Sequence, residues 1–129
     1  PVYNDLMAEV KSFLAERAQA LRDLGVPAER IVLDPGFGFG KTVSQNFELL
    51  AKTEDFLSLG YPLLYGMSRK SSLGAVTGVA KAEERLISSV TAHLLAVERG
   101  ASIVRVHDVK QMKEARTVYN AMIHYKDLK

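Results

Sequence analysis

The hydrophobic pattern of the chain alternates between helical spacing and short aliphatic runs. Near the start, apolar side chains recur every three or four residues, at Leu6, Val10, Phe13, Leu14, Ala18 and Leu21. This spacing predicts one amphipathic helix, with Asp5 near its start and Gly25 and Pro27 just past its end. The aliphatic run 31–33 follows, and it predicts a buried strand that stops at Asp34.

The middle of the chain repeats this order of helix and strand. A helix that opens at Thr42 or Ser44 has an apolar side formed by Phe47, Leu50 and Ala51. The apolar run 63–65, two leucines and a tyrosine, then predicts a second strand, which leads into a polar loop. After this loop, a helix that ends at Gly100 has one apolar face, formed by Leu86, Val90, Leu94 and Val97.

The last part of the chain predicts a third strand and a final helix. Residues 102–106 form the best strand pattern in the sequence. Asp108, with Gln111 three residues later, predicts a capped start for the helix that follows. The apolar positions of that helix are Met112, Ala115, Tyr119, Met122 and Ile123.

A helix followed by three strand-helix units predicts an α/β fold. Strands separated by helices pair in parallel, and a parallel sheet needs both faces covered. Three strands cannot close a barrel of eight, and an open three-stranded sheet would leave two edges unpaired. We therefore expect residues 1–129 to be the C-terminal half of a single (β/α)8 TIM-barrel domain whose N-terminal strands are not present in this chain. The start at Pro1, in mid-pattern and without an initiator methionine, favours a piece of a longer polypeptide.

The composition removes several classes of function. The 17 basic and 15 acidic side chains are mixed along the chain, so the net charge of +2 forms no block that would bind nucleic acid. A few converging cations can still bind a small anionic substrate. The absence of cysteine excludes disulfides, zinc–thiolate sites and cysteine nucleophiles, and it suits a reducing cytosol. Because the apolar runs are too short for a membrane span and the start lacks a signal-peptide pattern, we expect a soluble, cytoplasmic protein with no membrane partner.

The loop after the first strand, residues 34–42, combines glycines with an aromatic ring, a carboxylate and a lysine. It is not a P-loop, because Pro35 stands where that motif needs its first glycine, and its glycines alternate too strictly for a dinucleotide fingerprint. The backbone can lie close to a flat ligand beside Phe39, and the Asp34 carboxylate can accept two N–H bonds from an amino-pyrimidine edge. A structural turn capped by Asp34 explains the same residues equally well.

Two further groups of polar residues follow the second and third strands. The loop 66–72 contains Arg69 and Lys70 among hydroxyl residues, which can bind an anion or remain solvated. Strand alternation places Ile103, Arg105 and His107 on one face and Val104 and Val106 on the other. An arginine inside a strand is costly to bury without an anionic partner, which favours a functional role for Arg105. His93 is interpreted as a packing residue of its helix, and neither it nor His124 is assigned a role.

Together, the segments 33–41 (LDPGFGFGK), 66–71 (GMSRKS) and 105–108 (RVHD) closely resemble the C-terminal motifs of the dihydropteroate synthase family. Members of this family are transferases of folate biosynthesis. They condense para-aminobenzoate with 6-hydroxymethyl-7,8-dihydropterin pyrophosphate to give 7,8-dihydropteroate and pyrophosphate, and sulfonamides compete with the first substrate. The resemblance runs over essentially the whole chain and a little under half of a typical member.

This resemblance implies roles for individual residues. The implied pterin-binding residues are Asp34, Gly66, Lys70 and Arg105. The implied para-aminobenzoate-binding residues are Gly38, Phe39, Lys70 and Ser71. Arg105 and His107 would bind the pyrophosphate, which makes Lys70, Arg105 and His107 the candidate catalytic residues. Mg²⁺ would be bound mainly through the substrate pyrophosphate and a residue outside this chain, so no metal ligand is assigned here.

The resemblance also implies partners and leaves two alternatives. The chain would pack against the N-terminal half of the same barrel, form a homodimer through its last helices, and be inactive in isolation. One alternative is a pterin- or folate-binding methyltransferase barrel, which has no pyrophosphate to stabilise. Lys70 beside Arg105 and His107 argues against that alternative. The other is a non-catalytic fragment that binds a pterin without turnover.

Overall fold

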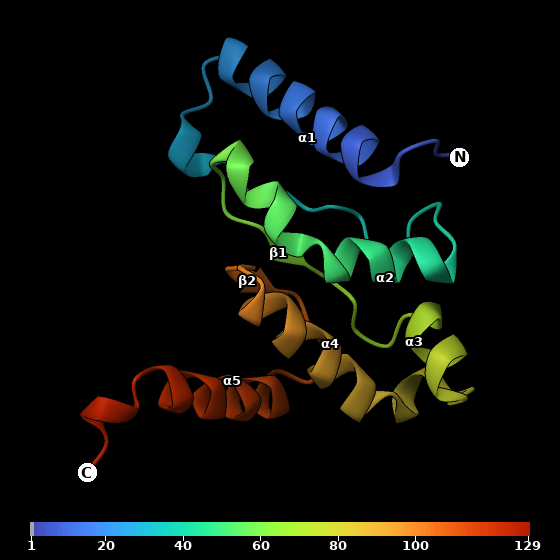
Figure 1. Ribbon diagram of the computed structural model, residues 1–129, viewed down its shortest axis with the longest axis vertical. Helices are drawn as coiled ribbons and strands as arrows, with labels where there is room; N and C mark the ends of the chain where they lie inside the picture. Colours follow the sequence, from blue (N-terminus) through green and yellow to red (C-terminus); the bar gives the residue numbers. More distant parts are fainter. Residues whose placement is uncertain (1) are drawn as a thin grey trace.

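The computed structural model describes residues 2–129, in which helices are stacked one after another past a short parallel sheet (Figure 1). The two ends of the chain lie on opposite sides of the stack, with α1 at one end and α5 at the other. The helices and strands are α1 (Leu6–Asp23), α2 (Val43–Ala51), β1 (Leu64–Tyr65), α3 (Ser71–Thr77), α4 (Leu86–Glu98), β2 (Ile103–Val104) and α5 (Val109–Ile123). Four 3₁₀ segments complete the order: η1 (Ala28–Arg30), η2 (Thr53–Leu59), η3 (Ala82–Glu84) and η4 (Tyr125–Asp127).

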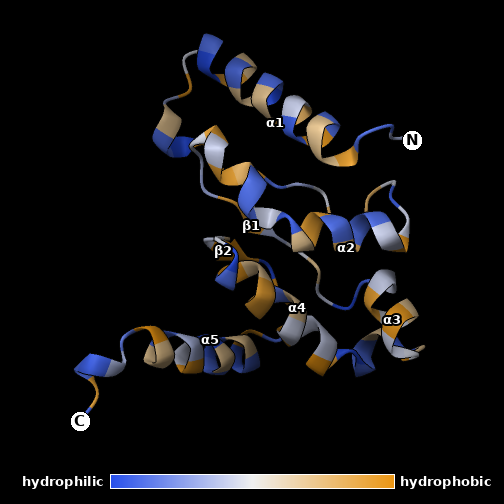
Figure 2. Cartoon of the chain, viewed as in Figure 1, coloured by the Kyte–Doolittle hydropathy of each residue, from blue (hydrophilic) through white to orange (hydrophobic). Residues whose placement is uncertain are grey.

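The first helix confirms its predicted start and end. The Asp5 side chain accepts the N–H of Ala8 in the first turn, and Glu9 accepts the N–H groups of Asn4 and Asp5 just before it. Figure 2 shows hydrophobic and hydrophilic residues alternating around α1. Its buried face consists of Leu6, Met7, Val10, Leu14 and Ala18, whereas two predicted core positions, Phe13 and Leu21, are exposed.

The sheet is parallel, as predicted, but its strands are shorter than the sequence pattern. β1 pairs with β2 through Leu64 opposite Ile103, and the predicted strand 31–33 forms only one parallel bridge, from Leu33 to Leu63. Ile31 and Leu33 are buried while Val32 is 44% exposed, so this segment alternates rather than being buried on both sides. The order of the three segments is therefore 33, β1, β2, which places their carboxyl ends at one edge.

The middle helices correct three predictions. Thr42, one of the two predicted starts, caps α2 in a capping box with Gln45, but Leu49 is buried where Ala51 was expected. The predicted polar loop after β1 contains a further helix, α3. The sequence did not predict this helix, because its glycine and β-branched residues have low helix propensity. In α4 the fully buried residues are the small or polar Ser89, Ala92, His93 and Ala96, while the predicted aliphatic face is half-buried. Two residues of that predicted face, Leu86 and Val90, lie instead beside α5, where they line a shallow pocket with Val118.

The core consists of two clusters of buried residues. One joins α1 to Leu33, Leu49, Phe56 and Leu63, and the other joins Phe37, Tyr65, Met67 and Leu73 to the alanines of α4. α5 buries only Met112, so most of its predicted apolar face is exposed or half-buried. None of the helices within residues 2–129 is both long enough and apolar enough to cross a membrane.

Candidate functional site

The three strand-end loops meet at one edge of the sheet and bring Asp34, Lys70 and Arg105 together. The backbone N–H of Arg105 donates to the carbonyl of Tyr65, which fixes the start of the third loop against the end of β1. The Arg105 Nη1 atom lies 3.8 Å from Asp34 Oδ2. Gly66 lies under the Arg105 side chain, where an added Cβ would be 2.8 Å from Cζ, so a side chain at this position would displace the guanidinium.

The Asp34 carboxylate stabilises the turn with one oxygen and faces Arg105 with the other. Its Oδ1 accepts the N–H of Gly36, which forms the turn, and its Oδ2 is the atom nearest Arg105. The structural and the functional interpretations of this carboxylate are therefore compatible. Lys41, which the sequence did not single out, donates from Nζ to the carbonyls of Gly36 and Phe39 and holds the glycine-rich loop in place. Burial lowers the pKa of Lys41, although the nearby Asp34 charge opposes that shift.

Lys70 reaches across to the glycine-rich loop. Its Nζ donates to the carbonyl of Phe37 and lies 4.5 Å from the centroid of the Phe39 ring, within cation–π range. Burial lowers the pKa of Lys70, the Asp34 charge raises it, and the Arg105 charge lowers it further. The predicted neighbour Gly38 lies against this side chain, and Ser71 is exposed at the first position of α3.

The backbone before Lys70 is held in a strained conformation. Arg69, with φ of +60°, is the only non-glycine residue with positive φ among residues 2–129. Its N–H donates to Ser89 Oγ, its carbonyl accepts from Arg85, and its guanidinium donates to Asp108 Oδ1. Asp108 therefore stands at the start of α5 without capping it through its side chain, which corrects the predicted cap.

His93 of α4 binds the backbone of the loop that contains Arg69 and Lys70. Its Nε2 accepts the N–H of Met67 and its Nδ1 lies 2.6 Å from the carbonyl of Ser89, so the ring is neutral with Nδ1 as the donor. Burial lowers the pKa of His93, in agreement with that neutral form. The prediction of a satisfied packing histidine is confirmed. Its contact with the Met67 backbone could not be found from helical spacing, because it depends on how α4 meets the loop.

His107 contacts the second loop rather than Arg105. Its Nδ1 lies 2.7 Å from Ser68 Oγ, and its backbone N–H donates to the same hydroxyl. The predicted alternation is present, since Val104 and Val106 are half-buried while Arg105 and His107 are exposed. β2 ends at Val104, however, and the Arg105 side chain is 60% exposed, so the cost of burying an arginine does not arise here.

The edge as a whole suits a ligand with a hydrogen-bonding ring edge and an anionic group. Asp34 offers acceptors, while Lys70, Arg105 and Lys41 offer positive charge. No three His, Cys, Asp or Glu side chains of residues 2–129 are grouped so that they could hold a metal ion. One carboxylate among cations is a poor magnesium site by itself, because Mg²⁺ prefers several oxygen ligands.

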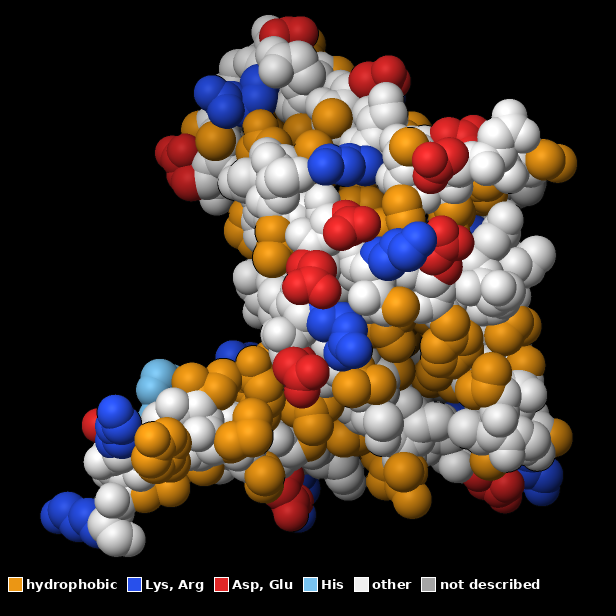
Figure 3. Space-filling model, viewed as in Figure 1, with side chains coloured by type: hydrophobic (Ala, Val, Ile, Leu, Met, Phe, Trp, Pro, Cys, Tyr) orange, Lys and Arg blue, Asp and Glu red, His pale blue; other side chains and the backbone are white. Residues whose placement is uncertain are grey.

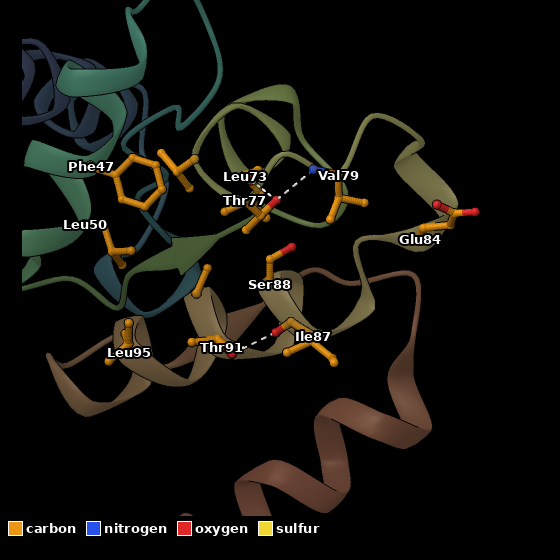
Figure 4. Close-up of a pocket in the computed structure, with 12 residues that line it drawn as sticks. Phe47, Leu50, Leu73, Thr77, Val79, Glu84, Ile87, Ser88, Thr91 and Leu95 are labelled. Carbon is orange, nitrogen blue, oxygen red and sulfur yellow. Dashed lines mark hydrogen bonds between the residues drawn. The ribbon is translucent and has the colours of Figure 1, made fainter.

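An apolar cavity of about 440 Å³ lies between α2, α3 and α4, away from this edge (Figure 4). Its polar side chains are mostly satisfied locally: the Thr77 hydroxyl donates to the carbonyl of Leu73, and the Thr91 hydroxyl to that of Ile87. None of the predicted site residues lines it. The strand-end edge is therefore the candidate functional site.

Comparison with known proteins gives a consistent family assignment. A family model described as "Pterin binding enzyme" matches residues 1–107. Dihydropteroate synthase of Escherichia coli K12 is 43% identical over 129 residues, which cover all of this chain and 45% of that protein. The chain thus spans about 45% of the length of the curated relatives it matches.

Solved structures show the same extent of similarity. The Xanthomonas albilineans dihydropteroate synthase in complex with 7,8-dihydropteroate superposes with a TM-score of 0.95 and 47% identity, over 96% of this chain and 47% of that chain. The same enzyme with 4-aminobenzoic acid gives a TM-score of 0.94 at 47% identity, over 96% of this chain and 45% of that chain. The fold is therefore that of the corresponding part of these enzymes.

Proposed function

Because this chain belongs to the pterin-binding enzyme family, we propose that it is the C-terminal part of a dihydropteroate synthase. The observation that carries the proposal is the convergence of Asp34, Lys70 and Arg105 at one edge of the sheet. In the proposed reaction, the bond between the pterin methylene and the pyrophosphate oxygen breaks. A bond forms from the methylene to the aniline nitrogen of para-aminobenzoate, which loses a proton.

The pterin is proposed to bind with its amino-pyrimidine edge at Asp34 and with its ring face against Arg105. The Asp34 Oδ2 atom is the one not used by the turn, so it can accept N–H bonds from the amino-pyrimidine edge. The Arg105 guanidinium lies over Gly66 and can stack on the flat ring. The X. albilineans enzyme was solved with 7,8-dihydropteroate, which contains this ring, in support of a pterin site in the same fold.

Para-aminobenzoate is proposed to bind beside Gly38, Phe39, Lys70 and Ser71. The Phe39 ring is 64% exposed and lies next to the Lys70 ammonium, so it offers an apolar surface beside a positive charge. A sulfonamide would compete for this surface. The complex of the X. albilineans enzyme with 4-aminobenzoic acid supports this choice of ligand.

Pyrophosphate is proposed to leave toward Arg105 and His107. Both side chains are exposed at the third loop, and Ser68 holds the His107 ring through Nδ1. Their role would be electrostatic, because donors that face a leaving group stabilise the charge that develops on it. Mg²⁺, bound through the pyrophosphate oxygens and a residue outside this chain, would neutralise the same charge.

The missing part of the active site is proposed to be the N-terminal half of the same (β/α)8 barrel, with residues 1–129 as the C-terminal half. A groove of about 660 Å³ runs beside β2 and α5, lined by Val104, Val106, Val109 and Met112 with Arg116 and Lys113. The exposed Ile103 lies on the same open strand. Such an edge needs a partner, because unpaired strand groups are costly. We also propose a cytoplasmic location, which the lack of cysteine in the sequence suits.

The reaction itself can be tested with the complete polypeptide. Incubated with Mg²⁺, para-aminobenzoate and the pterin pyrophosphate, it is expected to form 7,8-dihydropteroate and one equivalent of pyrophosphate, while residues 1–129 alone form none. Tight pterin binding without turnover would favour the non-catalytic alternative. Methyl transfer to or from a folate would favour the methyltransferase alternative.

A pair of glycine variants tests the para-aminobenzoate pocket. Gly38 and Gly60 have the same left-handed backbone, with φ of +86° and +84°, so alanine costs about 1–2 kcal/mol of stability at either position. A Cβ at Gly38 would lie 2.8 Å from Lys70 Cδ, whereas at Gly60 nothing lies within 4 Å. We expect Gly38→Ala to weaken para-aminobenzoate binding about tenfold, and Gly60→Ala to leave it unchanged. Equal affinities in the two variants, measured by calorimetry, would contradict the pocket.

The last two helices are proposed to form a homodimer interface, with Val97, Tyr119 and Met122 among its residues. Met122 is 62% exposed and Val97 and Tyr119 are half-buried. Figure 3 shows hydrophobic side chains spread along α5 on the visible face. We expect the complete protein to sediment as a dimer at micromolar concentration and Met122→Glu to give a folded monomer. A wild-type protein that sediments as a monomer would exclude this interface.

A further inference from the structure

We propose that Asn46 is a positioning residue that fixes the para-aminobenzoate pocket by tying its two loops to one helix. This inference rests on the proposed function and adds a residue to which no role has been assigned above. Asn46 belongs to α2, and its side-chain hydrogen bonds go to Gly38 and Ser72 rather than to Lys70 or Arg105. Its effect on the reaction would pass through the loops that it holds.

The Asn46 amide bridges the glycine-rich loop and the start of α3. Its Oδ1 accepts the N–H of Gly38 at 2.8 Å, and its Nδ2 donates to Ser72 Oγ at 2.9 Å. The orientation of the amide is determined, because a backbone N–H can only donate and therefore requires the oxygen. Asn46 is 1% exposed, so water cannot replace either bond cheaply.

One bonded group, Gly38, belongs to the proposed pocket, and the other, Ser72, is next to it. Gly38 lies between Phe37, whose carbonyl accepts the Lys70 ammonium, and Phe39, whose ring lies beside that ammonium. Ser72 follows Ser71 on the first turn of α3, for which Lys70 is the N-cap residue. One side chain thus sets the distance between the loop that supplies the aromatic surface and the loop that supplies the cation.

The helix that contains Asn46, α2, is itself held in place by its N-terminal cap and by the core. The start of α2 is closed by the Thr42 and Gln45 capping box, and Leu49 and Leu50 anchor its buried side in the two core clusters. The pterin side of the site depends less on Asn46. Asp34 is fixed by the N–H of Gly36, and Lys41 fixes the carbonyls of that loop independently.

The expected effect is therefore selective for one substrate. Asn46→Leu keeps the approximate volume of the side chain but removes both bonds, leaving the Gly38 N–H and the Ser72 hydroxyl without partners. We expect the KM for para-aminobenzoate to rise about tenfold, since each lost bond contributes roughly a factor of a few. The KM for the pterin pyrophosphate is expected to change by less than about twofold, because the Lys70 ammonium, which serves both substrates, is still held by the carbonyl of Phe37.

Two further variants separate positioning from stability. Ser72→Ala removes one end of the bridge and should raise the para-aminobenzoate KM about threefold. Thr53→Val is the matched control, because Thr53 is also fully buried, near the other end of α2, and its hydroxyl bonds the carbonyl of Leu50 and the hydroxyl of Tyr65, which lie outside the two loops. It should lower the midpoint of thermal unfolding while leaving both KM values unchanged.

The experiment is steady-state kinetics with both substrates, together with thermal unfolding, on the complete polypeptide and the three variants. A raised KM for para-aminobenzoate alone, larger in Asn46→Leu than in Ser72→Ala, supports the positioning role. Variants that unfold early but keep the wild-type KM would overturn it and leave the proposed function intact. If Asn46→Leu does not fold, an unchanged KM in Ser72→Ala overturns it equally. A wild-type protein that forms no dihydropteroate would overturn the proposed function, and this inference with it.

Discussion

Lys70→Ala in the complete polypeptide is expected to lower kcat by about a hundredfold and to weaken binding of both substrates. Lys70 lies between the Asp34 loop and Arg105, so its charge acts on both proposed ligand sites. Loss of the ammonium also leaves the Phe37 carbonyl without its donor and removes the contact with the Phe39 ring. Steady-state kinetics and a pterin-binding titration measure the two effects.

Arginine is not expected to rescue position 70. The lysine side chain passes so close to Gly38 that even a methyl group there would meet its Cδ. A planar guanidinium is wider than the compact ammonium that donates to the carbonyl of Phe37, so we do not expect it to reproduce this contact. Lys52→Ala is the control, because Lys52 is an exposed lysine paired with Glu48 on the outside of α2. An alanine variant at 70 with normal kinetics would show that Lys70 is only a surface charge.

The same lysine predicts a pH dependence. Burial lowers the pKa of Lys70 below its ordinary value of 10.5, and only the charged form provides the proposed electrostatic effect. Activity should therefore fall at alkaline pH as the pH passes through this lowered pKa, earlier than for an exposed lysine. In Lys70→Ala the residual activity should lose that dependence, which a pH profile of kcat/KM would reveal.

The features predictable from sequence were those fixed by local chemistry. Helical spacing and the acidic residues around Asp5 were enough to locate α1, because capping and amphipathicity act within a few residues. The convergence of Asp34, Lys70 and Arg105 was predictable for a different reason. Each follows a strand, and the carboxyl ends of parallel strands meet at one edge whatever the lengths of the strands.

The features that were missed depend on tertiary contacts. Asp108 was predicted to cap its helix, but the guanidinium of Arg69 provides a charged partner from a loop 39 residues away. α4 buries Ser89 and His93 rather than its large aliphatic residues, because these two side chains bind the backbone of the Arg69 loop. The role of Asn46 could not be predicted from the sequence for the same reason, since its two partners, Gly38 and Ser72, are far apart in the chain.

The second large effect is expected at Arg105 and His107. If both side chains act mainly as charge develops on the departing pyrophosphate, neutralising either should lower kcat together with kcat/KM. Each lost donor is expected to cost about 2–4 kcal/mol of transition-state stabilisation, by analogy with oxyanion donors. Arg105→Ala should also weaken pterin binding, because the guanidinium lies beside Asp34 and over Gly66. His107→Ala should leave pterin binding unchanged, since its contact is with Ser68.

Val104 and Val106 provide the matched controls, because strand alternation turns them to the opposite, half-buried side. Alanine at either position should lower the free energy of unfolding by about 1 kcal/mol through lost packing and leave kcat unchanged in the folded protein. The four alanine variants, at positions 104 to 107, are each measured by steady-state kinetics and by thermal unfolding. The results show which face of the third strand contains the reacting groups. If Arg105→Ala and His107→Ala unfold early yet turn over at the wild-type rate, both side chains are structural and the pyrophosphate leaves by another path. If the valine variants lose turnover while remaining stable, the reacting groups lie on the other face of the third strand.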